Sequence, residues 1–455
     1  MKEIKQGIFR AYDIRGVVDK DIDEEWVETL GRACGTYFRR AGLDKAVVGH
    51  DCRHSSPGYQ QAMIKGLVST GMDVVALNMV SSPMFYFAAK TLGRKAGVMI
   101  TASHNPPEFN GFKVWAGEST IHSEEIEKVF NIMAAGEFES GQGVVTEHDI
   151  RPSYVEELTS QLKLETPIKV VLDGGNGAGG DVTAEVLKKC GADVVELYTE
   201  PDGSFPNHHP DPIVEKYMTD LIAKVKETGA KAGIGLDGDG DRIGIIDEKG
   251  NMLYGDQLLA IYSRKLLEEK PGATIIAEVK CSHLMYQDIE KHGGKGIMWK
   301  TGHSLIKAKM RETGAELAGE MSGHMFFADR YYGFDDATYA ALRFVEIINF
   351  KPGEPVSEYL ADWPKTFNTP EIRKDCPDEI KFDVVKRAQD YFREKYDIID
   401  VDGVRITFDD GWGLVRASNT QPVLVLRFEA ESEKRLDEIR AIIEGPLDDW
   451  IDEMS

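Results

Sequence analysis

A hydroxyl, an imidazole and an amine lie on one short polar stretch, TASHNPPEFNGFK, at residues 101–113. The stretch follows the apolar run AGVMI, which predicts a strand that ends where a loop opens. Ser103 and His104 begin this loop, two prolines stiffen it, and Lys113 follows. Asn-Pro-Pro also forms tight turns without any chemistry. Two interpretations are therefore open: a simple turn, or a loop in which Ser103 is a nucleophile or carries a phosphate.

A second stretch, DGDGDR, alternates acidic residues with glycines that let the backbone turn tightly enough for Asp237, Asp239 and Asp241 to converge. Converging carboxylates repel unless a cation joins them, and such oxygen ligands suit Mg²⁺ or Ca²⁺. An EF-hand loop also begins with alternating Asp, but its sixth position is glycine, whereas Arg242 stands here. The loop also follows a strand-like run, GIGL, rather than a helix. A metal site is thus favoured over an acidic turn.

A hydroxyl nucleophile beside an oxygen-ligated dication is typical of phosphoryl transfer. Cations should then surround the phosphoryl group that Ser103 carries. Arg15 in FRAYDIRG, Lys113 in NGFK and Arg242 in GDGDR are candidates, and the alternative for each is a solvated surface charge.

Two further loops carry polar residues suited to a phosphorylated sugar. In EMSGH, Glu320 and Ser322 can bond sugar hydroxyls, and His324 can exchange protons unless it is only structural. RASNTQP combines a guanidinium with hydroxyl and amide donors, which suits a phosphate cradle as well as an ordinary hairpin turn. The candidates in this cradle are Arg416, Ser418, Asn419 and Thr420.

Three segments, 47–77, 169–197 and 274–299, each read as strand, polar loop, helix, glycine and strand. Each continues through a second helix into a strand that ends in TASHN, DGDGD or EMSGH. Ligands of α/β sheets bind beyond the carboxyl ends of strands, so the three loops should converge on one central cleft. A chance recurrence of common βαβ units is the alternative.

The pattern changes near residue 363, where a small α+β domain of different topology begins. We therefore expect an α/β protein with three related domains at 1–149, 150–250 and 251–362, a fourth at 363–455, and a hinge near 360–370.

The composition, with 54 Lys and Arg against 77 Asp and Glu and a net charge of −23, argues against a nucleic-acid partner. The five cysteines form no CxxC pair, which is typical of reduced thiols in a cytoplasmic protein. Neither a signal peptide nor an apolar run of about 18 residues is evident, so no membrane partner is expected. The expected assembly is a monomer or a weak homo-oligomer.

Two other motifs do not support a nucleotide site or a zinc site. DGGNGAGG at 173–180 lacks a convincing G-x-G-x-x-G spacing for a dinucleotide, and HDCRHSS at 50–56 lacks a second ligand pair with zinc spacing.

Taken together, FRAYDIRG, TASHNPPEFNGFK, DGDGDR, GEMSGH and RASNTQP resemble the loops of the α-D-phosphohexomutase superfamily, in the same order and over residues 9–422. Within it the chain is most similar to the bacterial phosphomannomutase/phosphoglucomutase family. The resemblance implies three related α/β domains and a fourth of TATA-binding-protein-like topology.

The resemblance also implies a reaction. Ser103 matches the phosphoserine, and with Asp237, Asp239 and Asp241 it would bind Mg²⁺. The enzyme would donate its phosphoryl group to mannose or glucose 1- or 6-phosphate, form a bound hexose 1,6-bisphosphate that turns around, and take the other phosphate back.

Further roles follow from the same resemblance. Glu320 and Ser322 match residues that hold the 3- and 4-hydroxyls, so both sugars, which differ at the 2-hydroxyl, should react. The RASNTQP residues match a distal phosphate site, and Lys280 and His303 match further substrate contacts. Arg15, Lys113 and His324 match groups near the transferring phosphate, and the sequence does not decide which of them is the base. His104 and Arg242 are further catalytic candidates.

Two other functions share some of these features. A metal-dependent phosphatase would use Ser103 and the aspartates but would not need the RASNTQP cradle. A non-catalytic sugar-phosphate binder could lose Ser103 or Lys113 without penalty, yet both are present.

Overall fold

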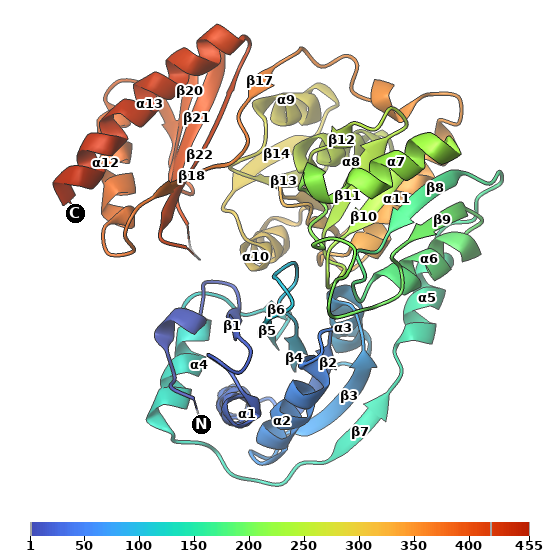
Figure 1. The fold of residues 1–455 in the computed structure, drawn as a ribbon, viewed down its shortest axis with the longest axis vertical. Coiled ribbons are helices and arrows are strands. Elements are labelled where there is room, and N and C mark those ends of the chain that lie inside the picture. The colour runs from blue at the N-terminus through green and yellow to red at the C-terminus, as the bar shows by residue number, and fades with distance from the viewer. Residues whose placement is uncertain (1, 419–420, 455) are drawn as a thin grey trace.

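The protein, a computed structural model that describes residues 2–418 and 421–454, is built from four sheets that follow one another along the chain (Figure 1). The first three sheets share a core of four strands in equivalent order: β5-β4-β2-β3, β11-β10-β8-β9 and β16-β15-β13-β14. In each, three strands are parallel, and the strand at one end joins its neighbour as an antiparallel hairpin. The predicted threefold repeat of one α/β architecture is thus confirmed.

The first sheet adds β1, β6 and β7 to this core. Its strands are β1 Ile14–Val17, β2 Lys45–His50, β3 Asp73–Met79, β4 Ala96–Ile100, β5 Phe109–Ala116, β6 Ser119–Thr120 and β7 Val145–His148. Its helices are α1 Glu24–Arg40, α2 Ser56–Val68, α3 Ser82–Thr91 and α4 Glu124–Ala135, preceded by the 3₁₀ turn η1 Gln6–Ile8. The strand β7 pairs with β3, so the predicted boundary at residue 149 follows the last strand of this sheet.

The second sheet consists of β8 Lys169–Asp173, β9 Asp193–Leu197, β10 Ala232–Leu236, β11 Ile243–Asp247 and β12 Met252–Leu253. Its helices are α5 Arg151–Thr159, α6 Gly180–Lys189 and α7 Thr219–Thr228, with the 3₁₀ turn η2 Glu215–Tyr217. The short strand β12 pairs with β11 and lies just beyond the expected boundary at residue 250. The boundary there stays a prediction, since this hairpin extends the second sheet across it.

The third sheet consists of β13 Thr274–Glu278, β14 Lys295–Trp299, β15 Leu317–Gly319 and β16 Met325–Phe327. Its helices are α8 Gly255–Glu269, α9 His283–Lys291, α10 His303–Thr313 and α11 Ala337–Phe350, followed by the 3₁₀ turn η3 Val356–Glu358.

The fourth sheet is antiparallel and carries two helices on its outer face (Figure 1). Its elements are β17 Phe367–Asn368, β18 Ile372–Asp375, α12 Lys381–Arg393, β19 Asp397–Ile399, β20 Val404–Phe408, β21 Gly411–Ala417, β22 Val423–Ala430 and α13 Glu433–Met454. The expected α+β tail is confirmed.

The central strands β4 and β10 are buried along their whole length, as is typical of strands covered on both faces. One continuous apolar cluster runs through the first three domains, where Tyr86 of α3 contacts Phe334 and Phe87 contacts Tyr154 of α5. The fourth domain has a separate core. None of the helices described in residues 2–418 and 421–454 is long and apolar enough to cross a membrane.

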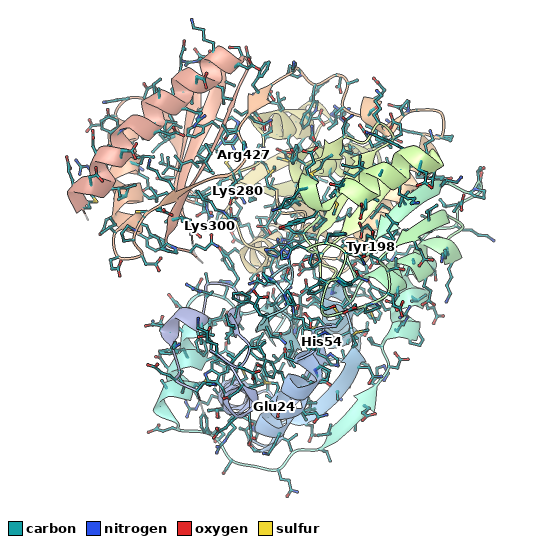
Figure 2. All side chains as sticks on the ribbon, viewed as in Figure 1. Glu24, His54, Tyr198, Lys280, Lys300 and Arg427 are labelled. Atoms are coloured by element: carbon teal, nitrogen blue, oxygen red, sulfur yellow. The ribbon has the colours of Figure 1, made fainter. Side chains whose placement is uncertain are left out.

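The fourth domain is attached to the third by two buried arginines. Arg405 donates to the carbonyls of Val279 and Cys281 at 2.6 and 2.7 Å and stacks on Trp412, and Arg427 donates to the carbonyl of Lys280 at 2.6 Å. Figure 2 shows Lys280 and Arg427 beside each other where the two domains meet.

We expect Arg405→Leu to destabilise this attachment by about 2–4 kcal/mol, because it leaves two buried carbonyls without donors. Calorimetry should show the fourth domain unfolding separately and earlier. Arg393→Leu, which removes only exposed ion pairs, is the control. A single unshifted transition in Arg405→Leu would contradict this account.

Candidate functional site

The three repeats each place a loop between the third parallel strand and its antiparallel partner: residues 101–108, 237–242 and 320–324. These loops contact one another. The backbone N–H of Ile243 donates to the carbonyl of Gly323 at 3.0 Å, and that of Ser82, at the start of α3, donates to the carbonyl of Asp239 at 2.8 Å. Chemistry-bearing residues from three domains are thereby brought to one centre.

Ser103 lies in the first loop and is almost fully buried. Its φ of +51° is a left-handed conformation, which is strained for a non-glycine residue and persists only where the surroundings enforce it. Its Oγ donates to Oδ2 of Asp237 at 2.8 Å and lies 3.2 Å from Nδ1 of His104. The hydroxyl therefore faces the aspartate loop, with an imidazole beside it.

Asp237, Asp239 and Asp241 are fully buried, and one oxygen of each lies within 4.8 Å of the others. The close approach of two loops requires the glycine between the first two aspartates. A Cβ at Gly238 would lie 2.5 Å from the carbonyl oxygen of Ser103. Only glycine therefore allows the aspartate loop and the serine loop to approach this closely.

The donor set fits a divalent metal ion. Burial, followed by repulsion from Asp239 and Asp241, raises the pKa of Asp237 well above its usual value. Within the described ranges 2–418 and 421–454, Oδ1 of Asp239 has no hydrogen-bond partner. A buried carboxylate oxygen that lacks a hydrogen-bond partner destabilises the folded state, and so does repulsion between buried carboxylates. A hard cation bound here would offset the repulsion and give the oxygen a partner. This triplet could therefore hold a metal ion.

Lys113 of β5 balances part of the same charge. Its Nζ donates to Oδ2 of Asp239 at 2.7 Å and to Oδ2 of Asp241, and also to Oγ of Ser82 at 3.2 Å. Burial would lower the pKa of this amine, but the two carboxylates raise it well above its usual value. The strand that follows the serine loop thus supplies a cation to the aspartate loop of the next domain.

Two arginines and a neutral histidine flank Ser103. Nη1 of Arg15 donates to Oδ1 of Asn105 at 2.8 Å. Nε of Arg242 lies 3.9 Å from Oδ2 of Asp237. Burial, followed by the nearby Arg242 and Arg15 charges, holds the pKa of His104 well below its usual value. Its imidazole is therefore uncharged.

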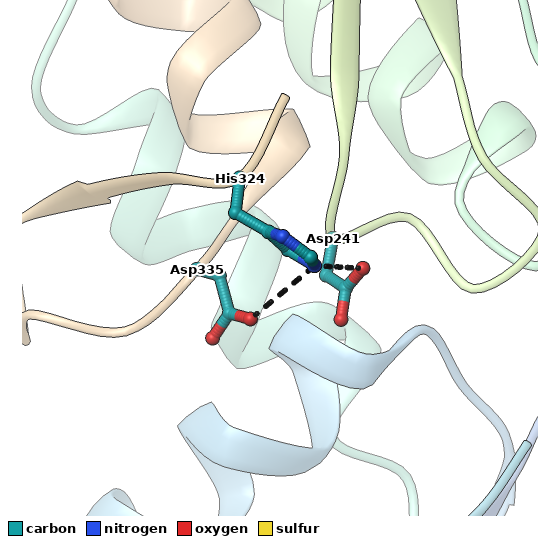
Figure 3. A group of neighbouring side chains, drawn as sticks. All are labelled: Asp241, His324 and Asp335. Carbon is teal, nitrogen blue, oxygen red and sulfur yellow. Dashed lines mark ion pairs between the residues drawn. The ribbon is translucent and has the colours of Figure 1, made fainter. Parts of the chain in front are cut away.

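His324 is surrounded by acidic groups (Figure 3). Its Nε2 lies 3.3 Å from Oδ1 of Asp241 and 3.9 Å from Oδ2 of Asp335, and its Nδ1 lies 3.0 Å from Oε2 of Glu320 and 2.9 Å from Oγ of Ser322. Burial would lower the pKa of His324, but the Asp241 carboxylate outweighs it and raises the pKa to about 9. Without a metal ion on Asp241, this residue is therefore an imidazolium at neutral pH.

The sugar-binding candidates join this centre through His324. Glu320 is buried and accepts the backbone N–H of Gly302 at 2.6 Å, and the ring of His303 stacks on that of His324 at 5.6 Å. Ser322 is partly exposed and contacts the same imidazole.

The remaining candidates form a second group at the fourth domain. Nζ of Lys280 lies 3.2 Å from Oε2 of Glu371, and Nε of Arg416 lies 3.0 Å from Oδ2 of Asp402. Ser418 is the last residue described before position 419, and its Oγ accepts the backbone N–H of Gln421. Two further members of the predicted cradle, Asn419 and Thr420, lie outside the described residues.

The predicted residues thus fall into two groups. One is the metal and serine centre, and the other is a cationic group on the third and fourth domains. The first contains Arg15, Ser103, His104, Lys113, Asp237, Asp239, Asp241, Arg242, His303, Glu320, Ser322 and His324; the second contains Lys280, Arg416 and Ser418.

Sequence reasoning missed two residues of the first group. Ser82 donates from Oγ to Oδ2 of Asp239 at 2.5 Å, and Asp335, which is fully buried, forms an ion pair with Lys307 at 2.8 Å beside His324. Ser82 stands in SSP, which reads as a helix start, and Asp335 stands in FDDA, which reads as a helix cap. Neither motif indicates that its residue also contacts the aspartate and histidine centre.

Fold and site together define an α/β enzyme built around a buried serine and an acidic triplet. Family models for phosphoglucomutase/phosphomannomutase match four consecutive parts of the chain: alpha/beta/alpha domain I at residues 6–140, domain II at 152–250, domain III at 254–367, and the C-terminal domain at 371–445. The chain belongs to the phosphoglucomutase/phosphomannomutase family.

Similar proteins agree with this assignment. A phosphomannomutase/phosphoglucomutase of Pseudomonas putida is 44% identical over 98% of this chain and 96% of its own length. A phosphoglucomutase of Neisseria gonorrhoeae is 41% identical over 98% of each chain. A solved phosphoglucomutase/phosphomannomutase family protein from Burkholderia thailandensis is 40% identical, with a TM-score of 0.90 and 96% of each chain covered. The chain is thus an isomerase, a reversible phosphohexose mutase, as the sequence predicts.

We expect Gly238→Ala to lower the mutase kcat by about 10²-fold, because the added methyl displaces the Ser103 carbonyl and shifts the serine from the aspartates by up to an ångström. Coupled kinetics would measure this. Gly353→Ala, where the methyl meets open space, is the control. An unchanged kcat in Gly238→Ala would show that the two loops need not approach this closely.

The raised pKa of His324 predicts a pH dependence of stability in metal-free protein. The folded pKa of about 9 exceeds the usual 6.5, so the charged imidazolium stabilises the fold fully below pH 6.5. That contribution is lost as the pH rises through 9. In EDTA-treated protein the thermal midpoint should fall over this range.

His324→Gln should reduce this slope, since the substituted residue does not titrate. His54→Gln, at an exposed position, should leave it unchanged. Equal slopes in wild type and His324→Gln would refute the assignment.

Proposed function

We propose that this chain interconverts the 1- and 6-phosphates of mannose and of glucose, with Ser103 as the phosphoryl carrier and a bound hexose 1,6-bisphosphate as the intermediate. The observation that carries the proposal is the contact between Oγ of Ser103 and Oδ2 of Asp237 at 2.8 Å, inside a buried centre. Phosphoryl transfer is catalysed by fixed charges around the transferring group, and a water-poor centre strengthens them.

Asp237, Asp239 and Asp241 are the groups that would hold Mg²⁺, with phosphorylated Ser103 as a further ligand. When bound, the ion neutralises negative charge on the transferring phosphoryl group. Lys113, already in contact with two of the aspartates, adds positive charge from the chain itself. Arg15 and Arg242 complete a cationic surrounding for the same group.

Two histidines with oppositely shifted pKa values are suited to move the protons. When Ser103 takes a phosphoryl group from the bisphosphate, its Oγ–P bond forms and its hydroxyl proton passes to neutral His104. The O–P bond to the sugar breaks, and imidazolium His324 gives its proton to the released sugar oxygen. In the opposite half of the cycle both protons return, so the two residues exchange roles.

The substrate's other parts are assigned to the remaining residues. Glu320 and Ser322 would bond the 3- and 4-hydroxyls, with His303 beside them. Lys280, Arg416 and Ser418, together with Asn419 and Thr420, would hold the phosphate that is not reacting. Because none of these contacts is directed at the 2-hydroxyl, mannose and glucose phosphates should both be accepted.

We also propose a cytoplasmic monomer or weak homo-oligomer that has neither a nucleic-acid nor a membrane partner. The net charge of −23 and the five free cysteines support this environment. A phosphatase that uses the same serine is the alternative, and the second cationic group argues against it.

A coupled assay tests the proposal directly. Wild type and Ser103→Ala would receive glucose 1-phosphate or mannose 1-phosphate with Mg²⁺ and trace hexose 1,6-bisphosphate. We expect wild type to form both 6-phosphates, and Ser103→Ala to lose at least about 10³-fold in rate because it has no carrier for the phosphoryl group. EDTA should abolish the wild-type rate, and added Mg²⁺ should restore it.

Ser160→Ala, at an exposed serine that follows α5 and bonds the carbonyl of Glu157, is the matched control and should retain full activity. Release of free phosphate without formation of the isomer would favour the phosphatase instead. Turnover of glucosamine 1-phosphate alone would refute the assignment of Glu320 and Ser322.

A further inference from the structure

One fully buried arginine, Arg53, contacts the loop that carries Ser103 but is itself outside both groups of predicted site residues. It belongs to the HDCRHSS stretch, which lacks zinc spacing and so has no role in the proposed chemistry. Its neighbour His54 is labelled in Figure 2, where the loop after β2 meets the second domain.

All five N–H groups of the guanidinium have acceptors. Nη2 donates to the carbonyls of Ser103 and Asn105 at 2.9 and 2.5 Å, and Nη1 donates to those of Pro106 and Phe109 at 2.6 and 2.9 Å. Three of the five bonds thus go to the serine loop, and a fourth goes to Phe109, the first residue of β5. The fifth, from Nε, goes to Asp51.

Asp51 fixes the arginine. Its Oδ2 accepts Nε of Arg53 at 3.2 Å, and its Oδ1 accepts the backbone N–H of Arg53 at 3.0 Å and Oγ of Ser56 at 2.6 Å. The carboxylate also supplies the opposite charge that a buried guanidinium requires. From the second domain, the ring of Phe205 covers the guanidinium at 5.2 Å.

The loop itself needs such a donor. Pro106 and Pro107 have no N–H, so this segment cannot form a regular ladder with a neighbouring strand. Its buried carbonyls must still be satisfied. Ser103 also needs contacts from other residues, because its left-handed backbone conformation is strained and persists only where the surrounding structure holds it.

We propose that Arg53 is a positioning residue for phosphoryl transfer, which holds the carbonyl of Ser103 so that the side chain faces the aspartate triplet. That carbonyl lies between Nη2 of Arg53 and Gly238, so its displacement moves Oγ of Ser103 relative to Asp237. A lysine cannot replace the guanidinium, because one nitrogen cannot reach four carbonyls. The inference rests on the proposed role of Ser103.

The test compares Arg53→Lys with Arg343→Lys, both in the full chain. Arg343 is also buried and paired, with Asp329 and Glu346, but it lies on α11 and contacts neither predicted group. Each variant is measured for thermal midpoint, for kcat and KM with glucose 1-phosphate at saturating hexose 1,6-bisphosphate, and for hydrogen exchange of residues 101–112.

We expect Arg53→Lys to lower kcat about 30- to 100-fold, since a misplacement of about 1 Å costs this much, while KM stays within about threefold. Exchange should accelerate in the serine loop alone. Arg343→Lys should lower the thermal midpoint and leave kcat and loop exchange unchanged. A wild-type enzyme without mutase activity would overturn the proposed function, whereas an active wild type with an unaffected Arg53→Lys would overturn this inference alone.

If Arg53→Lys does not fold, the variant Asp51→Asn tests the same proposal. It removes the charge that fixes Arg53 and leaves all four carbonyl bonds possible, so kcat should fall about 3- to 10-fold with faster exchange in the serine loop. A kcat equal to that of wild type, or a reduced kcat without faster loop exchange, would overturn the proposal.

Discussion

The burial of three carboxylates at one point is the constraint on which the rest of this structure depends. Asp237, Asp239 and Asp241 come from a single loop of the second domain, and buried charges persist only when cations face them. Arg242 of the same loop lies 3.9 Å from Asp237, but two further cations come from other domains: Lys113 from the first and His324 from the third. The second domain thus supplies only part of the compensating charge, so electrostatics as well as apolar contacts hold the first three domains together.

The repeated topology explains how such a centre arises. In each of the first three domains, the loop after the third parallel strand leads into an antiparallel neighbour, so all three loops leave their sheets from the same kind of edge. Strand order decides where a loop lies, and sequence decides what it carries. One loop holds Ser103, the next the aspartates, and the third Glu320 and His324. A repeat that is equivalent in backbone thus brings three different sets of side chains to one centre.

The sequence predicts the repeat and the main loops because periodicity and loop composition are local signals. The Ser103 hydroxyl and the aspartates could be anticipated in the same way. Local signals did not reveal the short strands β12, β17, β18 and β19, which form only because a neighbouring strand pairs with them. Nor did they reveal Arg53, which contacts Ser103 in another loop, or Asp335, which lies beside Asp241 of the second domain. Their contacts depend on how separate segments pack.

The attachment of the fourth domain has a consequence for the second cationic group. Arg405 and Arg427 donate to carbonyls of residues 279–281, the backbone that carries Lys280. The conformation of Lys280 is therefore linked to the docking of the fourth domain. Its ammonium already faces Glu371, whose pKa the Lys280 charge lowers to about 2. An anion that binds Lys280 would therefore have to replace Glu371 as the partner of this ammonium.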